Sequence, residues 1–360
     1  MEEGPMVSII VAHYLDDILS GCLRAIYERT QGVSFEVIVA DDQPYDDGSL
    51  GRALQKFPDI RVVKTGGGNG TPTRGMAAGY NRGLEVARGR YAMLMNNDVE
   101  VSTGWLGALV AAAETDERIG ACQPKVLSAR EPKRFDDGGA AGGMVDLLGY
   151  PFCLGRIFDT VEEDRGQYDS SRDLFWALGG AVFIRMSCLE KTGRMDEAFY
   201  MHMEEIDLCW RLHLAGFRVV SVPRSVVYHY GGWSLGTERF VRVYLKQRNN
   251  LVMVLKNWSA GRLLWIFPLR VCLELCTLLA IFKGDWKHPA AALGGLLWVF
   301  THPLNILRRR WEAQRFRTVS DREVAAKMYR GSVVFQYFVK GVRTAVKLLD
   351  DPADGQSGPG

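Results

Sequence analysis

Residues 91–101 read YAMLMNNDVEV, an apolar strand that ends in two carboxamides and a carboxylate. Two earlier apolar runs also end in polar side chains. They are VSIIVAHY at residues 7–14 and FEVIVADD at residues 35–42. Continuous apolar runs of this kind indicate strands that are buried on both faces of a sheet. Segments with helical spacing separate these strands. The sequence therefore predicts β-α-β units and an α/β fold with a mainly parallel sheet flanked by helices.

Acidic side chains stand at the predicted carboxyl ends of these strands, where ligands bind in parallel sheets. Asp41 and Asp42 follow the second strand, and Asp98 follows the strand at residues 91–95. A divalent cation that bridges two phosphates needs an oxygen ligand on rigid backbone, and Asp98 is placed to supply it. The alternative is that the Asn-Asn-Asp run only caps a helix that starts near Trp105. The sequence alone favours neither the metal ligand nor the helix cap.

Three more acids, Glu204, Glu205 and Asp207, stand at the start of a predicted helix over residues 204–215. Acids in a first helical turn are common, because they interact favourably with the helix dipole. Three acids in four residues exceed what capping needs, so one of them is a candidate general base. His229 ends an extended segment just before two glycines. A lone histidine more often makes a structural hydrogen bond than binds a metal, and both interpretations of His229 stay open.

The composition of the 360 residues excludes several classes of protein. Lys and Arg number 44 and Asp and Glu 42, a net charge of +2, so nothing points to nucleic acid as a partner. Apolar residues make up 47% of the chain, enough for a large core and two domains. Seven cysteines without paired spacing favour a reducing compartment. The acidic N-terminus lacks the pattern of a secretory signal, and we expect a cytoplasmic protein.

The composition divides the chain into three parts. They are a domain over residues 1–235, a helical region over residues 236–350 and a disordered tail over residues 351–360. Residues 263–282 and 290–307 are apolar but interrupted by proline or charge, so neither is a clean spanning helix. We expect helices that dip into a bilayer, with the arginines at 308–310 at anionic headgroups. The alternative is a buried helical subdomain.

Two further segments are predicted to be loops. The glycine-rich residues 65–74, which include Asn69 and Arg74, could approach phosphates, although they match neither the P-loop nor the dinucleotide signature. Residues 128–172 are long for a loop inside a compact domain, which indicates a lid or an acceptor-binding segment. A strand over residues 217–222 is expected to end at Pro223.

The order of these motifs resembles the family 2 glycosyltransferases with a GT-A fold, particularly their rhamnosyltransferase-like branch. The resemblance covers residues 7–234, about two thirds of the chain. The matching segments are VSIIVAHY, FEVIVADD, Asp47-Gly48-Ser49, Asn69-Gly70, Asn81-Arg82-Gly83-Leu84, MLMNNDVEV, Leu178-Gly179-Gly180-Ala181, MEEIDLCWRL and VPRSVVYHYGGWS. Their order and spacing carry the match, because no single motif is specific enough.

The resemblance implies an inverting transfer of one sugar from a nucleotide-diphosphate sugar, UDP- or dTDP-linked, to a saccharide or lipid-linked acceptor. The apolar C-terminal runs lead us to expect a protein that is peripheral or monotopic at the cytoplasmic face of the membrane surface. The implied nucleotide pocket comprises His13, Tyr14, Asp41, Asp42, Asn69, Arg74 and Asn97. The implied ligands of Mn²⁺ or Mg²⁺ are Asp98, His229 and Asn96. The implied catalytic base is Glu205, with Glu204 and Asp207 as rivals, and Trp176 and Gly180 are implied near a sugar.

The chain departs from the family pattern at the base, where Glu205 replaces the usual aspartate and adds one methylene. It also lacks the QxxRW motif of processive synthases, since residues 247–250 read Gln-Arg-Asn-Asn, so we expect one sugar per event. A catalytically silent scaffold that binds a nucleotide sugar or glycan is the alternative function, because a fold does not dictate an activity.

Overall fold

The structure is a computed structural model, and it describes residues 4–14, 17–66, 73–136, 140–231 and 240–349. Three of the sequence predictions lie outside the described residues. These are the role of Asn69, the boundary between residues 235 and 236, and the disordered tail over residues 351–360.

A central sheet organises the fold, with strand order β11-β13-β6-β12-β4-β1-β2-β3 and with β5 paired to β13. Its strands are β1 (Val7–His13), β2 (Phe35–Asp41), β3 (Arg61–Lys64), β4 (Tyr91–Asn96), β5 (Val99–Val101), β6 (Ile119–Ser128), β11 (Asp173–Leu174), β12 (Ala181–Arg185) and β13 (Arg218–His229). Strand β1 lies between β2 and β4, parallel to both, and β13 is parallel to β6. Strand β12 enters antiparallel between β4 and β6. The predicted α/β sheet, mostly parallel, is confirmed.

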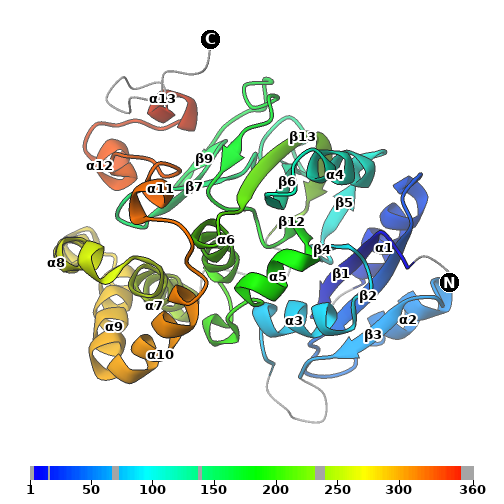
Figure 1. The fold of residues 1–360 in the computed structure, drawn as a ribbon, viewed down its shortest axis with the longest axis horizontal. Coiled ribbons are helices and arrows are strands. Elements are labelled where there is room, and N and C mark those ends of the chain that lie inside the picture. Colours follow the sequence, from blue (N-terminus) through cyan, green and yellow to red (C-terminus); the bar gives the residue numbers. More distant parts are fainter. Residues whose placement is uncertain (1–3, 15–16, 67–72, 137–139, 232–239, 350–360) are drawn as a thin grey trace.

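Helices cover both faces of this sheet (Figure 1). One face carries α1 (Ile18–Arg29), α2 (Ser49–Lys56) and α4 (Trp105–Glu114), and the other carries α3 (Met76–Val86), α5 (Met186–Thr192) and α6 (Glu204–Leu214). Ile9 and Val11 belong to the first cluster and Ile10 to the second, because side chains alternate along a strand. Both faces are therefore buried, which explains why β1 is a continuous apolar run.

The predicted loop over residues 128–172 is not a plain loop. It contains a second sheet with the order β10-β9-β8-β7. The strands are β7 (Gly143–Val145), β8 (Pro151–Cys153), β9 (Arg156–Ile157) and β10 (Thr160–Val161). The sequence prediction was wrong here because strands of two or three residues are too short to show an alternating pattern.

Strand β13 continues past Pro223, where the sequence predicts an end. Its register against β6 shifts between Val222 and Val226. A bulge of this kind accommodates a proline, which has no N–H to donate to a neighbouring strand. The strand therefore reaches His229, which pairs with Val99 of β5. This pairing brings His229 next to the residue before Val99, the acid Asp98.

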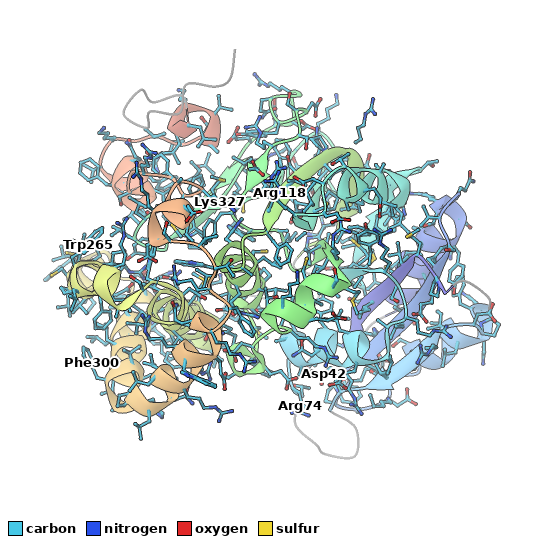
Figure 2. All side chains as sticks on the ribbon, viewed as in Figure 1. Asp42, Arg74, Arg118, Trp265, Phe300 and Lys327 are labelled. Atoms are coloured by element: carbon cyan, nitrogen blue, oxygen red, sulfur yellow. The ribbon has the colours of Figure 1, made fainter. Side chains whose placement is uncertain are left out.

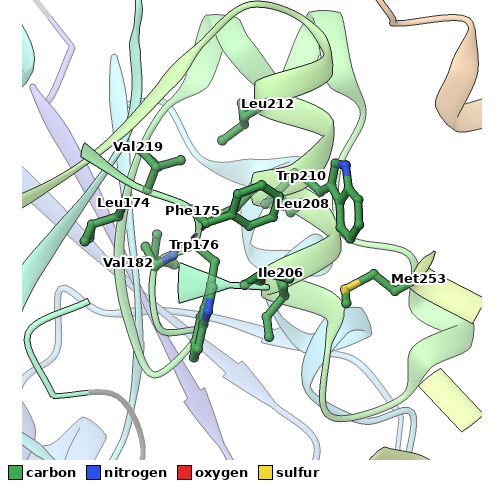
Figure 3. Packing of buried hydrophobic residues seen from close by; sticks show 14 of the residues in the cluster. Leu174, Phe175, Trp176, Val182, Ile206, Leu208, Trp210, Leu212, Val219 and Met253 are labelled. Carbon is green, nitrogen blue, oxygen red and sulfur yellow. Dashed lines mark hydrogen bonds between the residues drawn. The ribbon is translucent and has the colours of Figure 1, made fainter. Parts of the chain in front are cut away.

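The C-terminal region forms a group of helices beside α6, on the opposite side of α6 from β1 and β2 (Figure 1). They are α7 (Phe240–Asn257), α8 (Ala260–Cys276), η2 (Thr277–Lys283), α9 (Lys287–Thr301), α10 (Pro303–Gln314), α11 (Asp321–Ala325), α12 (Val333–Phe338) and α13 (Ala345–Leu349). Met253 of α7 packs near Trp210 and Ile206 of α6 in the hydrophobic cluster between sheet and helices (Figure 3). Among the described helices, none is long and apolar enough to cross a membrane alone, whereas α9 and α10 pass this test as a pair bent by 82°.

Candidate active site

Asp98, His229 and Asp136 meet beside the ends of β5 and β13. Nε2 of His229 lies 3.0 Å from Oδ1 of Asp98, and its Nδ1 lies 3.0 Å from Oδ1 of Asp136. Burial disfavours a charged imidazole, but the carboxylates of Asp136 and Asp98 outweigh burial and raise the pKa of His229 to about 10. The predicted partners Asp98 and His229 are therefore adjacent. Asp136 was missed, since an acid in a glycine-rich loop carries no signal in the sequence.

The pair of Asp98 and His229 fits a divalent cation. Asp98 would supply a hard oxygen and His229 a ring nitrogen, both on rigid backbone at strand ends, and both side chains are largely buried. A cation would replace the proton between them, while Asp136 holds the other ring nitrogen, as carboxylates do for histidine ligands. No third His, Cys, Asp or Glu joins them as a ligand among the described residues, so a diphosphate and water would complete the shell.

Asn96, the third predicted ligand, is held in place by its neighbours. The hydroxyl of Tyr80 in α3 donates to its Oδ1 at 3.0 Å, and its backbone N–H donates to the carbonyl of Gly180 at 3.1 Å. A Cβ on Gly180 would lie 3.0 Å from Nδ2 of Asn96, so this close approach favours glycine. Gly180 therefore lies against Asn96, and its predicted position near a sugar stays a prediction. Tyr80 is a further neighbour that the apolar pattern of α3 concealed.

Glu204 and Glu205 begin α6 with carboxylates that each keep one buried oxygen, Oε2, without a hydrogen bond. Burial raises the pKa of Glu205 to about 7, against the backbone N–H groups of the first helical turn. Burial and the neighbouring Glu205 raise the pKa of Glu204 well above its ordinary value. A carboxylate whose pKa lies near neutrality is suited to accept a proton from a hydroxyl.

The two halves of the site face one short turn, Gly179-Gly180, before β12. A Cβ on Gly179 would lie 3.3 Å from Cβ of Glu205, and Gly180 lies against Asn96. The buried hydroxyl of Tyr80 lies near carboxylates from both parts of the site. Its pKa is raised well above its ordinary value by burial and then by the carboxylates of Glu204, Asp98 and Glu205. The candidate base and the candidate metal ligand therefore lie around one space.

Asp207, the third candidate base, has a structural role instead. Its carboxylate is fully buried, and Oδ2 lies 2.9 Å from Nε of Arg211 and 2.9 Å from Nζ of Lys256. Nδ2 of Asn257 donates to Oδ1 at 2.9 Å. Both carboxylate oxygens of Asp207 are therefore engaged by groups of the protein rather than directed at a substrate. This geometry removes Asp207 from the candidates, and Lys256 and Asn257 were not foreseen because they lie 50 residues away.

A turn with unusual backbone angles presents Glu204 and Glu205. Tyr200, His202 and Met203 have φ angles of 65°, 67° and 74°, a region that costs residues other than glycine free energy. Asn249 of α7 holds this turn, because its Nδ2 donates to the carbonyls of Phe199, Met201 and His202 at 2.9, 2.8 and 2.9 Å. Sequence reasoning missed Asn249, since nothing in the segment 247–250 indicates so distant a partner.

Of the predicted nucleotide residues that the structure describes, His13, Tyr14, Asp41, Asp42 and Asn97 lie at the carboxyl ends of β1, β2 and β4. His13, at the end of β1, contacts both the residue after β4 and the start of α2. Its Nδ1 lies 3.2 Å from Nδ2 of Asn97, and its Nε2 lies 3.1 Å from Oγ of Ser49. Asp41 is fully buried and forms an ion pair with Lys64. Tyr14 is 42% exposed beside them.

Asp42 fixes the start of α3. Its Oδ1 accepts the backbone N–H of Arg74 at 3.0 Å, and its Oδ2 accepts that of Gly75 at 3.0 Å (Figure 2). The side chain of Arg74 is 62% exposed and reaches Glu197 at 3.4 Å. Asp42 is thus engaged by backbone, whereas Arg74 keeps an exposed guanidinium at the edge of the predicted nucleotide pocket.

A cavity of about 590 Å³ opens between α1 and β5, beside Asp98. Its lining includes Asn97, Arg29 and Tyr230. This volume is within the range of small-molecule sites in proteins, which is a few hundred to about 1,000 Å³. Space for a sugar-sized ligand therefore exists next to the candidate metal ligand.

Trp176, predicted near a sugar, belongs to the core instead. Its side chain is 5% exposed, lies against Gly143, and donates its indole N–H to the carbonyl of Met144 at 3.0 Å (Figure 3). Its polar atom is already satisfied inside the protein. The sequence could not distinguish an aromatic residue of the core from one that stacks on a sugar.

Comparison with known proteins relates this architecture to enzymes of sugar transfer. Residues 8–139 match the profile of the family described as glycosyl transferase family 2. Rhamnosyltransferase WbbL of Escherichia coli is 38% identical over 225 residues, which are 62% of this chain and 82% of that protein. The N-acetylglucosaminyl-diphospho-decaprenol L-rhamnosyltransferase of Mycobacterium tuberculosis is 28% identical over 248 residues, 65% of this chain and 78% of that protein.

A solved structure of GalNAc-T7 with UDP, GalNAc and Mn²⁺ matches with a TM-score of 0.57 and 16% identity. The match covers 76% of this chain and 51% of that chain. At this identity the likeness shows the fold alone.

Proposed function

The chain belongs to the family 2 glycosyltransferases and has their GT-A fold, and from this premise we propose that it transfers a deoxyhexose to a lipid-linked saccharide. The donor is a nucleotide-diphosphate sugar, dTDP- or UDP-linked. The names of its relatives support the proposal, because one is a rhamnosyltransferase and another an L-rhamnosyltransferase on N-acetylglucosaminyl-diphospho-decaprenol. A polyprenol acceptor also supports a location at the cytoplasmic face of a membrane.

The observation that carries the proposal is that Glu205 and Asn96 lie against the Gly179-Gly180 turn, with Asp98 two residues after Asn96. Breaking the bond between the sugar and its diphosphate places positive charge on the sugar ring and negative charge on the leaving group. Asp98 and His229 would hold a divalent cation, which would supply Lewis-acid stabilisation of that negative charge. Glu205 accepts the proton of the acceptor hydroxyl from the other side of the sugar, so the displacement inverts the anomeric centre.

The neighbouring residues prepare Glu205 and Asp98 for these roles. Burial keeps the pKa of Glu205 near neutrality, so the carboxylate is a stronger base than an exposed glutamate. Asp136 orients the ring of His229, and Tyr80 orients Asn96 beside Asp98. Asn249 fixes the turn before Glu205, which keeps the base in place without rearrangement during the reaction.

We further propose that each encounter adds a single sugar. The QxxRW motif of processive synthases is absent from the sequence. The products of a purified reaction, separated by mass, would then show an increment of one residue whatever the ratio of donor to acceptor.

The test of the proposed function is a transfer assay with purified protein, a panel of dTDP- and UDP-linked sugars and a polyprenol-diphosphate saccharide. We expect one donor class to react, an inverted anomeric configuration in the product, and loss of activity with a chelator that Mn²⁺ or Mg²⁺ restores. The variant Glu205→Gln should lower kcat about 10²–10⁴-fold with little change in donor affinity. Glu204→Gln is the matched control, because it neutralises the adjacent buried acid.

Two outcomes would contradict the proposal. Substantial turnover by Glu205→Gln together with loss of activity in Glu204→Gln would move the base to Glu204. Binding of a nucleotide sugar without transfer to any acceptor, and without hydrolysis, would favour the silent scaffold.

A further inference from the structure

Helix α8 buries a charged pair beside the apolar Ile266 and exposes apolar side chains on its outer face. It buries Arg270 and Glu274, which are 0% and 1% exposed and form an ion pair of 2.6 Å. Its outer face instead carries Leu264, Trp265 and Leu269, which are 79%, 47% and 43% exposed. A helix on the surface of a water-soluble protein places apolar residues inward and charges outward. The outer face of α8 therefore suits an apolar environment.

Groups of the protein contact the inward charges of α8, although Nε of Arg270 and Oε2 of Glu274 are buried without a hydrogen bond. Nη1 of Arg270 donates to the carbonyl of Leu148 at 2.8 Å, and the guanidinium lies 3.8 Å from the ring centre of Tyr150. The hydroxyl of Tyr150 donates to Glu274 at 3.3 Å. Burial of an ion pair is costly unless further partners satisfy it. These contacts leave α8 free to present an uncharged outer face.

The same apolar surface continues over α9 and α10. Leu293, Leu297 and Phe300 follow helical spacing on α9 and are 47%, 65% and 61% exposed. Leu304, which is 79% exposed, lies on α10 beyond the bend of 82°. The inner side of α9 packs on α7, where Gly295 lies against the backbone of Arg248. Trp265 and Phe300 lie on the same outer edge of the molecule, away from the sheet (Figure 2). The exposed apolar side chains of α8, α9 and α10 therefore all face away from the sheet.

The charge around this surface favours anionic lipid as its partner. Residues 259–317 contain nine Lys and Arg but three Asp and Glu. Arg270, Arg309 and Arg310 are turned inward, whereas Arg308 and Arg315 are exposed beside the apolar side chains. The guanidinium of Arg262 lies 4.7 Å from the ring centre of Trp265, and that of Arg315 lies 5.8 Å from Trp311. Tryptophan beside arginine is typical of the membrane interface. A second copy of the same basic face would be repelled.

The expectation that all three arginines at 308–310 contact headgroups is corrected by the structure. Arg310 donates to the carbonyls of Leu255 and Trp258 at the end of α7 and the start of α8. Arg309 is 12% exposed and reaches Asp196 at 3.4 Å. Arg308 alone of the three is strongly exposed, at 81%. The lipid-facing charge therefore comes mainly from arginines beside tryptophans.

We propose that the C-terminal apolar face, defined by Leu264, Trp265, Phe282, Phe300, Leu304 and Trp311, docks on an anionic bilayer surface without spanning it. Each of these six side chains is at least 47% exposed. The bent pair of α9 and α10 enters the interface, with its apolar residues below the headgroups. This inference deepens the proposed membrane location, and its test measures lipid binding, so it can fail while the transferase activity stands.

The test is co-sedimentation of the full chain with vesicles of phosphatidylcholine alone or of phosphatidylcholine with phosphatidylglycerol. We expect binding to the anionic vesicles that weakens with added salt, and weak binding to the neutral ones. The double variant Phe300→Ser/Leu304→Ser should lower the partition constant about 10–100-fold, because two exposed apolar side chains no longer enter the lipid. Tyr45→Ser is the matched control, since Tyr45 is 61% exposed in the loop between β2 and α2.

The outcomes decide between lipid and other occupants. Wild-type binding by the double variant would overturn the proposal, as would equal loss in Tyr45→Ser. The proposal would also be overturned if the wild type is a dimer in sedimentation velocity and does not bind vesicles, while the double variant is monomeric. This result would assign the face to a second copy of the chain. Leu264→Ser gives an independent measurement on α8 if the double variant does not fold.

Discussion

Replacing Asn249 with alanine should loosen the turn that presents the proposed base Glu205 while leaving the predicted nucleotide residues in place. The Nδ2 group of Asn249 lies within 2.9 Å of three carbonyl oxygens, those of Phe199, Met201 and His202. The group has only two hydrogens, so the three contacts amount to about two full hydrogen bonds. Each buried hydrogen bond contributes about 1 kcal/mol net, and its loss leaves carbonyls without a partner, which costs more. We expect the free energy of unfolding to fall by about 2–4 kcal/mol.

The same variant should lower kcat more than it weakens donor binding. The turn that Asn249 holds contains three residues with positive φ, and each stores about 1–3 kcal/mol that relaxation would release. Relaxation would move Glu205, and a displacement of about 1 Å in a catalytic group costs about 10²-fold in rate. The nucleotide residues His13 and Asp41 lie on β1 and β2, which Asn249 does not touch.

The assay combines urea denaturation with steady-state kinetics and nucleotide binding. Asn305→Ala is the control, because Asn305 is exposed on α10 and the substitution is the same. A variant Asn249→Ala that is destabilised but keeps wild-type kcat would refute the reasoning, since the clamp would then serve stability alone. Equal losses in kcat and nucleotide affinity would refute it as well, because they would indicate general disorder of the site.

Three more perturbations have expected outcomes. The kcat of the wild type should rise with pH around a midpoint near 7, because Glu205 accepts a proton only as a carboxylate and burial raises its pKa to about 7; a flat pH profile would contradict this. Lys256→Met should lower the free energy of unfolding by about 3 kcal/mol in urea denaturation, because buried Asp207 loses one of its two cations; an unchanged midpoint would show that Arg211 suffices. Gly75→Ala should cost at least about 1–3 kcal/mol and reduce kcat, because its φ is +83° and a Cβ would lie 2.3 Å from the carbonyl oxygen of Tyr200; wild-type values in both assays would be inconsistent with that clash.

The parallel part of the sheet could be predicted because its signal is local. Ile9, Ile10 and Val11 are buried on alternate faces, so the pattern of a strand buried on both sides is written in consecutive residues. The path of β13 could not be predicted, because Pro223 ends a strand by local rules and only pairing with β6 and β5 carries it on. The small sheet of β7–β10 was missed because its strands are too short to show a period.

The candidate site also contains residues that the sequence could identify and residues whose place only the structure shows. Asp98, Glu205 and His229 stand at predicted strand or helix ends, so their chemistry was visible from the sequence, and their catalytic and metal-binding roles stay predictions. Asp207 and Trp176 have residue types suited to the site, but the structure places Asp207 between two cations and Trp176 in the core. Burial and partners decide such cases, and a residue type does not specify them.

The sequence by itself determined the family, the parallel α/β core and the ends of the strands where chemistry is possible, because periodicity and motif order are properties of neighbouring residues. The tertiary structure alone decided which side chains share a space. Asp136 reached His229, and Asn249 reached the turn before Glu204, across long stretches of chain. It also decided that α8 turns Arg270 inward and its leucines outward, since that choice depends on what covers each face. Contacts between distant segments form only when the chain is folded, so no local pattern records them.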